Sequence, residues 1–228
     1  MKTIQDYQNT ENFKRHLDVI KANVPVSYGG LKLYEGKRNY LMQSPKEFAA
    51  TLCFLEDYFK DKAVKYLEIG TASNLTNSMI WNNLKIQENI IIDNLECPNI
   101  AESLVGNLSF KQNSVLIVGD STNSNIKQKI DLFGYKYELI LIDGNHDFEY
   151  VTKDFEYYYR FLADDGLLMF HDIDNDKVAG VRQFIKTNPI LKNKFLQCCN
   201  FVDSENYIKK ETFGSKCGIG IFSLIRNQ

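Results

Sequence analysis

Residues 138–172 read ELILIDGNHDFEYVTKDFEYYYRFLADDGLLMFHD, and this stretch decides the fold. Two short apolar runs, Glu138–Asp143 and Leu167–Phe170, flank an aromatic segment at Phe148–Phe161 that is compatible with a helix. A strand, a helix and a second strand in this order form a right-handed crossover unit whose strands are parallel. The stretch therefore predicts part of a parallel sheet.

Polar side chains follow both apolar runs at the point where each predicted strand ends. Asp143 and His146 follow the first run, and His171-Asp172 follow the second. Ligands of an open parallel sheet bind just beyond the carboxyl ends of its strands. We therefore expect these four side chains to converge on one cleft. The third histidine of the chain, His16, lies in a predicted N-terminal helix and is expected at the surface.

The same alternation of strands and helices continues outside this stretch. Further strands are predicted at Lys65–Ile69, Asn89–Asp93, Ser114–Val118, Phe195–Val202 and Gly218–Ile225. Helices are predicted in residues 1–24 and at Pro45–Lys60, Leu75–Leu84, Ile100–Leu108, Ile126–Phe133 and Val178–Thr187. This alternation predicts an α/β fold with a doubly wound, mostly parallel sheet of seven strands. Residues 203–217 hold no clear helix, and so the last two strands are expected to form an antiparallel C-terminal hairpin.

The N-terminal part is expected to differ from the rest of the chain. Residues 1–42 are predicted to form a helical and loop extension ahead of one domain at residues 43–228. Within it, Val24–Tyr40 contains a proline and several glycines and is expected to lack regular structure. Ser44-Pro45 is a typical helix start, and Glu47 makes a reciprocal capping box with the serine possible.

The composition excludes several classes of protein. The 228 residues are 44% hydrophobic and 25% charged, with a net charge of −2, which gives no basic footprint for nucleic acid. No apolar run approaches the roughly 18 residues that a membrane span needs. The N-terminus lacks the apolar core of a signal peptide, and the five cysteines lack metal-site spacing. We therefore expect a cytoplasmic protein with reduced thiols that binds neither nucleic acid nor membrane.

The turn after the first predicted strand, Gly70–Asn74, contains one glycine and several small residues. Gly70 lets the backbone turn tightly, and the next helix points its free amides at whatever lies in the turn. Asp93 ends the next predicted strand, where a carboxylate can accept hydrogen bonds from ribose hydroxyls, and Asp120 stands at the end of the strand after it. These features favour a ligand site over a plain turn.

Two common phosphate-binding patterns are absent from this turn. Neither GxGxxG nor GxxxxGK[ST] occurs, which disfavours a dinucleotide site or a phosphate cradle. Glu68, just before the glycine, would repel a pyrophosphate but suits a cationic or hydroxyl-rich ligand. A nicotinamide-dependent oxidoreductase therefore stays only as an alternative.

The segment EIGTASN, residues 68–74, resembles motif I of class I S-adenosylmethionine-dependent methyltransferases. The predicted sheet with its antiparallel hairpin is also similar to their fold. The resemblance implies that S-adenosylmethionine binds here, with Asp93 on the ribose and Asp120 beside the adenine. The remaining cofactor-binding residues that it implies are Glu68, Gly70, Thr71, Ala72, Ser73, Asn74 and Asp143. This family often has a glycine where Asn74 stands.

Asp143–His146 and Gly166–Asp172 resemble one branch of these enzymes, which contains cephalosporin hydroxylase-like proteins and macrocin-type sugar O-methyltransferases. The resemblance covers about residues 40–225. It implies an O-methyltransferase whose acceptor is a small molecule or saccharide, methylated on a hydroxyl of a sugar or another polyhydroxylated compound. It also implies His146 as the catalytic base, next to Asp143. Related sequences often carry aspartate where Asn145 stands.

A metal ion fits the ends of the two apolar runs. Asp143 and Asp172 would lie side by side, and two close carboxylates repel each other unless a cation intervenes. Hard oxygen ligands favour Mg²⁺, whereas His171, as a third ligand, would also suit Mn²⁺. The alternative is a metal-free site in which Asp172 caps a loop and His171 packs in the core.

His146 is suited to remove a proton from a hydroxyl, because a histidine titrates near neutral pH. A metal that lowers the pKa of a diol would share this task. A merely polar loop histidine is the alternative. A non-catalytic relative that binds only the cofactor or a partner also stays possible, and exposed N-terminal helices could form a homodimer contact.

Overall fold

The structure is a computed structural model that describes residues 1–23, 32–34, 37–39, 41, 43–96, 112–175, 178–203 and 217–225. The helix predicted at Ile100–Leu108 lies outside these residues. No helix in the described ranges is both long and apolar enough to cross a bilayer.

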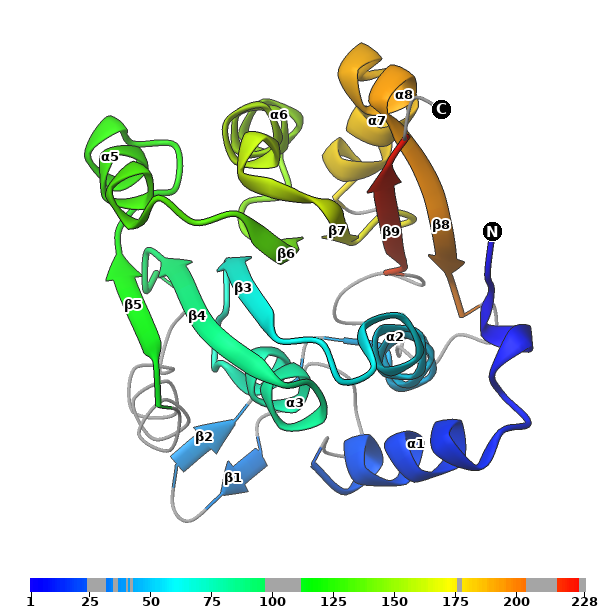
Figure 1. The fold of residues 1–228 in the computed structure, drawn as a ribbon. Coiled ribbons are helices and arrows are strands. Elements are labelled where there is room, and N and C mark those ends of the chain that lie inside the picture. The colour runs from blue at the N-terminus through cyan, green and yellow to red at the C-terminus, as the bar shows by residue number, and fades with distance from the viewer. Residues whose placement is uncertain are drawn as a thin grey trace.

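A seven-stranded sheet forms the centre of the molecule, with the strand order β5-β4-β3-β6-β7-β9-β8 (Figure 1). Five strands are parallel: β3 (Val64–Ile69), β4 (Ile86–Asp93), β5 (Ser114–Val118), β6 (Tyr137–Ile142) and β7 (Leu162–His171). Two are antiparallel to their neighbours: β8 (Phe195–Phe201) and β9 (Ile219–Leu224). The predicted mostly parallel sheet with an antiparallel C-terminal hairpin is confirmed. The chain reverses its direction of winding between β3 and β6, where ligands bind in such sheets.

Helices cover both faces of the sheet (Figure 1). One face carries α1 (Glu11–Asn23), α2 (Pro45–Phe59) and α3 (Leu75–Asn83), and the other carries α5 (Ser124–Phe133), α6 (Phe148–Tyr158) and α7 (Gly180–Thr187). Successive strand residues point to opposite faces, so that Tyr66 packs in the first core and Leu67 in the second. Short helices occur at η1 (Ile4–Asp6), η2 (Tyr159–Phe161) and α8 (Pro189–Lys194).

Three N-terminal and C-terminal features differ from the predictions. Residues 32–34 and 37–39 pair as antiparallel strands β1 (Lys32–Tyr34) and β2 (Lys37–Asn39), within a segment expected to lack regular structure. The glycines there were interpreted as breakers, although glycine is common between hairpin strands. The short α8 was not predicted, although Asn188 and Pro189 are an N-cap and a first helical residue.

The third difference concerns His16, which is buried in the N-terminal extension. The side chains of Phe13 and Ile20 in this extension pack in the same cluster as those of α2. His16 is 3% exposed rather than at the surface, with its Nε2 atom 3.0 Å from Glu56. Lys2 pairs with Cys199 and so covers part of the outer edge of β8.

Candidate active site

A cavity of about 380 Å³ lies at the carboxyl ends of the parallel strands. Most of the residues that the sequence singled out line it: Glu68, Gly70, Thr71, Ala72, Asp93, Asp120, Asp143, His146, His171 and Asp172. Ser73 and Asn74 do not line it; both are fully buried, and Asn74 donates a hydrogen bond to the Thr71 hydroxyl at 2.9 Å. The turn after β3 and the ends of β6 and β7 therefore share one cleft, as predicted for Asp143, His146, His171 and Asp172.

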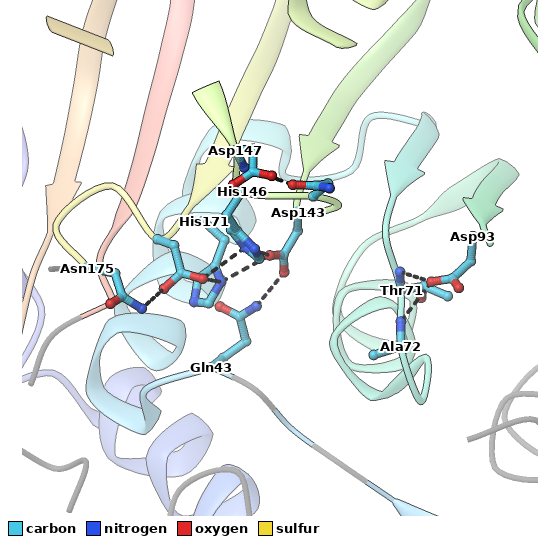
Figure 2. Close-up of polar contacts among 11 residues, drawn as sticks. Gln43, Thr71, Ala72, Asp93, Asp143, His146, Asp147, His171 and Asn175 are labelled. Carbon is cyan, nitrogen blue, oxygen red and sulfur yellow. Dashed lines mark hydrogen bonds and ion pairs between the residues drawn. The ribbon is translucent and has the colours of Figure 1, made fainter. Parts of the chain in front are cut away.

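Asp93, the last residue of β4, fixes the turn that follows β3. Its Oδ2 atom accepts hydrogen bonds from the main-chain amides of Thr71 and Ala72 at 2.7 and 3.0 Å (Figure 2). Its Oδ1 atom accepts one from Leu95 at 2.7 Å. The predicted ribose-binding carboxylate thus also shapes the turn, and it lines the cavity from that position.

Gly70 allows this turn to touch the other half of the site. Its φ angle is +79°, which favours glycine, and a Cβ atom there would lie 2.2 Å from the carbonyl oxygen of Asp143. The close approach therefore requires glycine for both conformation and space. It places the turn Gly70–Asn74 directly against the segment that carries Asp143.

Two further acidic residues, Glu68 and Asp120, line the cavity near this turn. Glu68 is buried, and its Oε2 atom accepts hydrogen bonds from the Tyr66 hydroxyl at 2.6 Å and from the Asn77 amide at 2.5 Å. Asp120 accepts hydrogen bonds from the main-chain amide and hydroxyl of Thr122, both at 2.8 Å. Both carboxylates are thereby fixed in orientation before any ligand arrives.

Four ionisable side chains face one another at the other end of the cavity, and we call Asp143, His146, His171 and Asp172 the Asp–His cluster. Asp143 follows β6, His146 precedes α6, His171 ends β7 and Asp172 follows it. One potential ligand atom of each residue lies within 4.8 Å of the other three. Figure 2 shows the side chains of Asp143, His146 and His171 pointing toward a common centre.

The imidazole nitrogens of the Asp–His cluster alternate with carboxylate oxygens. The Nδ1 atom of His171 lies 3.0 Å from Asp143 Oδ1 and 3.2 Å from Asp172 Oδ2. The Nε2 atom of His146 lies 2.9 Å from Asp172 Oδ2 and 3.4 Å from Asp143 Oδ1. The two carboxylates therefore turn one oxygen each toward the same two rings.

Amide side chains hold the outer oxygens of these two carboxylates. Gln43 donates a hydrogen bond from Nε2 to Asp143 Oδ2 at 2.9 Å, and Asn175 donates one from Nδ2 to Asp172 Oδ1 at 2.8 Å (Figure 2). Neither amide was predicted as a site residue. Gln43 stands next to the Ser44-Pro45 helix start, but no local pattern shows that it reaches a residue 100 positions away.

The charges of the Asp–His cluster compensate one another. Burial alone would raise the pKa of Asp143 and Asp172, but His171 and His146 beside them hold each pKa below its usual value. Burial alone would lower the pKa of both histidines, but the carboxylates raise that of His146 to about 9 and that of His171 well above its usual value. Without a cation, the two carboxylates therefore favour the protonated form of both rings.

Glu47 supports the cluster from the first turn of α2. It is buried, and its oxygens accept hydrogen bonds from the main-chain amides of Asp203 at 2.7 Å and Gly218 at 2.9 Å. Burial raises its pKa to about 7. The predicted capping box with Ser44 is wrong, because the serine makes no capping bond and Glu47 binds these two distant amides instead. The carbonyl of Gly218 in turn accepts from Ile173, the residue after Asp172.

The Asp–His cluster fits a divalent cation by its donor atoms. It combines two carboxylate oxygens and two imidazole nitrogens, all of which are usual metal ligands. The outer oxygens are already held by amides, an arrangement that orients ligands in metal sites. His146, predicted as a base, joins the three predicted ligands in this set.

Comparison with known proteins agrees with the fold. Residues 67–173 match the family model described as a methyltransferase domain. The uncharacterized protein R132 of Acanthamoeba polyphaga mimivirus is 30% identical over 128 residues, which are 52% of this chain and 55% of that protein. The match therefore spans about half the length of this relative.

Solved methyltransferases share the architecture. The N-methyltransferase NodS of Bradyrhizobium japonicum, solved with S-adenosylhomocysteine, has a TM-score of 0.56 at 13% identity, over 94% of this chain and 97% of its own. The O-methyltransferase TomG of Streptomyces achromogenes, solved with S-adenosylmethionine, has a TM-score of 0.57 at 15% identity, over 96% and 91%. The methyltransferase MycE of the mycinamycin pathway, solved with Mg, S-adenosylhomocysteine and mycinamycin VI, has a TM-score of 0.50 at 13% identity, over 78% and 49%.

At these identities the structural likeness shows the fold, and the solved proteins methylate different kinds of atom. The sheet order, the cavity at the winding reversal and the matched domain nevertheless agree with one another. Residues 67–173 match a methyltransferase domain and the sheet has the class I fold, which supports the predicted enzyme class of S-adenosylmethionine-dependent methyltransferases.

Proposed function

We propose that the protein is a divalent-metal-assisted O-methyltransferase that uses S-adenosylmethionine. Its acceptor is a hydroxyl of a sugar or of another polyhydroxylated small molecule. One observation carries the proposal: the Asp–His cluster and the Gly70 turn line the same cavity and touch at Asp143. A methyl donor on the turn would thus lie next to a cation at the cluster.

The charge of the cavity supports a cationic cofactor. The described residues that line it include six carboxylates and no lysine or arginine: Glu68, Asp93, Glu96, Asp120, Asp143 and Asp172. A cleft lined by one sign of charge concentrates ligands of the opposite sign. This favours the positive sulfonium of S-adenosylmethionine and an uncharged acceptor over a phosphorylated one.

The transfer itself forms a bond between the acceptor oxygen and the methyl carbon and breaks the bond between that carbon and sulfur. The hydroxyl proton must leave as well. A bound divalent cation would supply charge that stabilises the deprotonated hydroxyl. Asp143 and His146 have the more exposed side chains of the cluster, 14% and 28%, against 9% for Asp172 and 3% for His171, so they are closest to an acceptor.

His146 can take that proton or bind the cation. It cannot do both at once, because each role uses the lone pair of Nε2, the atom that faces Asp172. The role of Asp143 is to hold the cation beside the cofactor turn, with Gln43 fixing its outer oxygen.

Calorimetry and a turnover assay test the proposal. We expect S-adenosylhomocysteine to bind and NADH not to bind. We also expect a panel of free and glycosidic hexoses and deoxyhexoses to include an acceptor that converts S-adenosylmethionine to S-adenosylhomocysteine, with activity lost in EDTA. Binding of NADH without S-adenosylhomocysteine would favour the oxidoreductase alternative. Cofactor binding without turnover on any polyol would favour a non-catalytic relative.

A further inference from the structure

We infer that the Asp–His cluster selects a first-row transition metal over Mg²⁺, with His146 and His171 both as ligands. This inference rests on the proposed function and narrows it. It changes the predicted role of His146 from base to ligand.

The first argument is the spacing of the donor atoms. Around the cluster, neighbouring nitrogen and oxygen atoms are 2.9, 3.0, 3.2 and 3.4 Å apart. Ligands held at about 2.1 Å from one cation are separated by about 3.0 Å in octahedral geometry and about 3.4 Å in tetrahedral geometry. The four atoms therefore need little movement to surround one ion.

The second argument is the way in which the carboxylates are held. Asp143 and Asp172 each have one oxygen bound by an amide side chain, from Gln43 and Asn175. This leaves one oxygen per carboxylate for the centre, so neither can offer the two-oxygen contact that large hard cations such as Ca²⁺ use. With one oxygen from each carboxylate and one nitrogen from each histidine, half of the donor atoms that face the centre are nitrogen.

The third argument is the chemistry of that donor set. Mg²⁺ prefers oxygen ligands and keeps several waters, whereas imidazole suits later first-row metals such as Fe²⁺, Ni²⁺, Cu²⁺ and Zn²⁺. His171 is 3% exposed, and its Nδ1 atom faces both carboxylates. Nδ1 is therefore placed to bind an ion together with the inward carboxylate oxygens.

Metal titration of EDTA-stripped protein tests the inference without an acceptor. We expect Mn²⁺ to bind at least about 100-fold more tightly than Mg²⁺, and pulsed electron paramagnetic resonance of bound Mn²⁺ to show coupling to two imidazole nitrogens. His146→Gln and His171→Gln should each remove one coupling and weaken Mn²⁺ binding about 10- to 100-fold. His16→Gln, at a histidine outside the cluster that is as buried as His171, should change neither measurement.

Two results would overturn the inference. Equal affinity for Mg²⁺ and Mn²⁺, or no binding of either, would remove the selectivity. Unchanged Mn²⁺ binding and nitrogen coupling in His146→Gln would return His146 to the role of base. S-adenosylhomocysteine binding, measured on the same samples, separates the two proposals. If the wild-type protein binds S-adenosylhomocysteine but no metal, the chain is a methyltransferase without this metal site. If the wild-type protein does not bind S-adenosylhomocysteine, the proposed function itself is contradicted.

Discussion

The two ends of the cavity are built in different ways. At the Gly70 turn, the Asp93 carboxylate is held by three main-chain amides. At the Asp–His cluster, the inward oxygens of two carboxylates face two imidazole rings. The cofactor end is therefore fixed by the backbone, whereas the cluster is held by charges that protons or a cation can balance. Substitutions should alter shape at the first end and charge at the second.

Gly70→Ala should have the largest effect, because this residue joins the two ends. Its Cβ atom would lie 2.2 Å from the Asp143 carbonyl oxygen, and the φ angle of +79° is itself unfavourable for alanine. We expect loss of both cofactor and metal binding, with at least about 3 kcal/mol of destabilisation measured by denaturant unfolding.

Gly134→Ala is the matched control for that variant. Gly134 has a φ angle of +64°, but a Cβ atom there would meet nothing within 4 Å. It should cost only about 1 kcal/mol from the backbone and leave both ligands bound. Equal effects of the two variants would mean that the contact between Gly70 and Asp143 does not matter.

Asp172→Asn should affect the cluster alone. Asp172 has a φ angle of 58°, which asparagine also tolerates, so the backbone should be unchanged. Loss of the charged ligand should weaken Mn²⁺ binding at least about 100-fold and leave S-adenosylhomocysteine binding within about twofold in calorimetry. Asp174→Asn, at an acid that pairs with Arg182 outside the cluster, should leave both affinities unchanged.

Asp154→Asn should change the pH dependence of stability. Asp154 is buried in α6, where burial raises its pKa to about 7, beside Asp120. Because the folded-state pKa is raised, its stabilising contribution is present below the unfolded pKa of about 4 and is lost as pH rises through about 7. Compared with wild type, the asparagine variant should gain about 3 kcal/mol in unfolding free energy between pH 4.5 and pH 8. A constant difference across this range would show that Asp154 does not titrate with a raised pKa.

Asp93→Asn should have the smallest effect and should act at the cofactor end alone. Asparagine keeps one acceptor oxygen for the turn amides but loses the charge and the second acceptor. We expect about tenfold weaker S-adenosylhomocysteine binding, with Mn²⁺ affinity unchanged. A matching fall in Mn²⁺ affinity would show that the two ends are not separable in this way.

The fold and the cleft were predictable because their signals are local. Apolar runs, a glycine turn and acidic residues at strand ends each occupy a few neighbouring positions, and a parallel sheet brings its strand ends together. The positions of Asp143, His146, His171 and Asp172 follow from that rule. Their mutual orientation does not, because it depends on ring rotamers that packing decides.

The supporting contacts were not predictable, because they join distant parts of the chain. Gln43 reaches Asp143 across 100 positions, and Glu47 reaches Asp203 and Gly218 across 156 and 171. The local pattern at Glu47 favoured a capping box, but Glu47 instead accepts hydrogen bonds from these two buried main-chain amides. Similarly, His16 lies on a polar helix whose burial depends on its packing against α2.

The central claim is that the cofactor methyl group and a cation at the Asp–His cluster occupy one cavity. Nuclear magnetic resonance of S-adenosylmethionine labelled with ¹³C on the methyl group, bound with and without Mn²⁺, tests it most directly. We predict that Mn²⁺ strongly broadens the methyl resonance in the wild-type protein and leaves it narrow in Asp172→Asn. A narrow methyl line in wild-type protein whose Mn²⁺ is shown to be bound by electron paramagnetic resonance would contradict the claim.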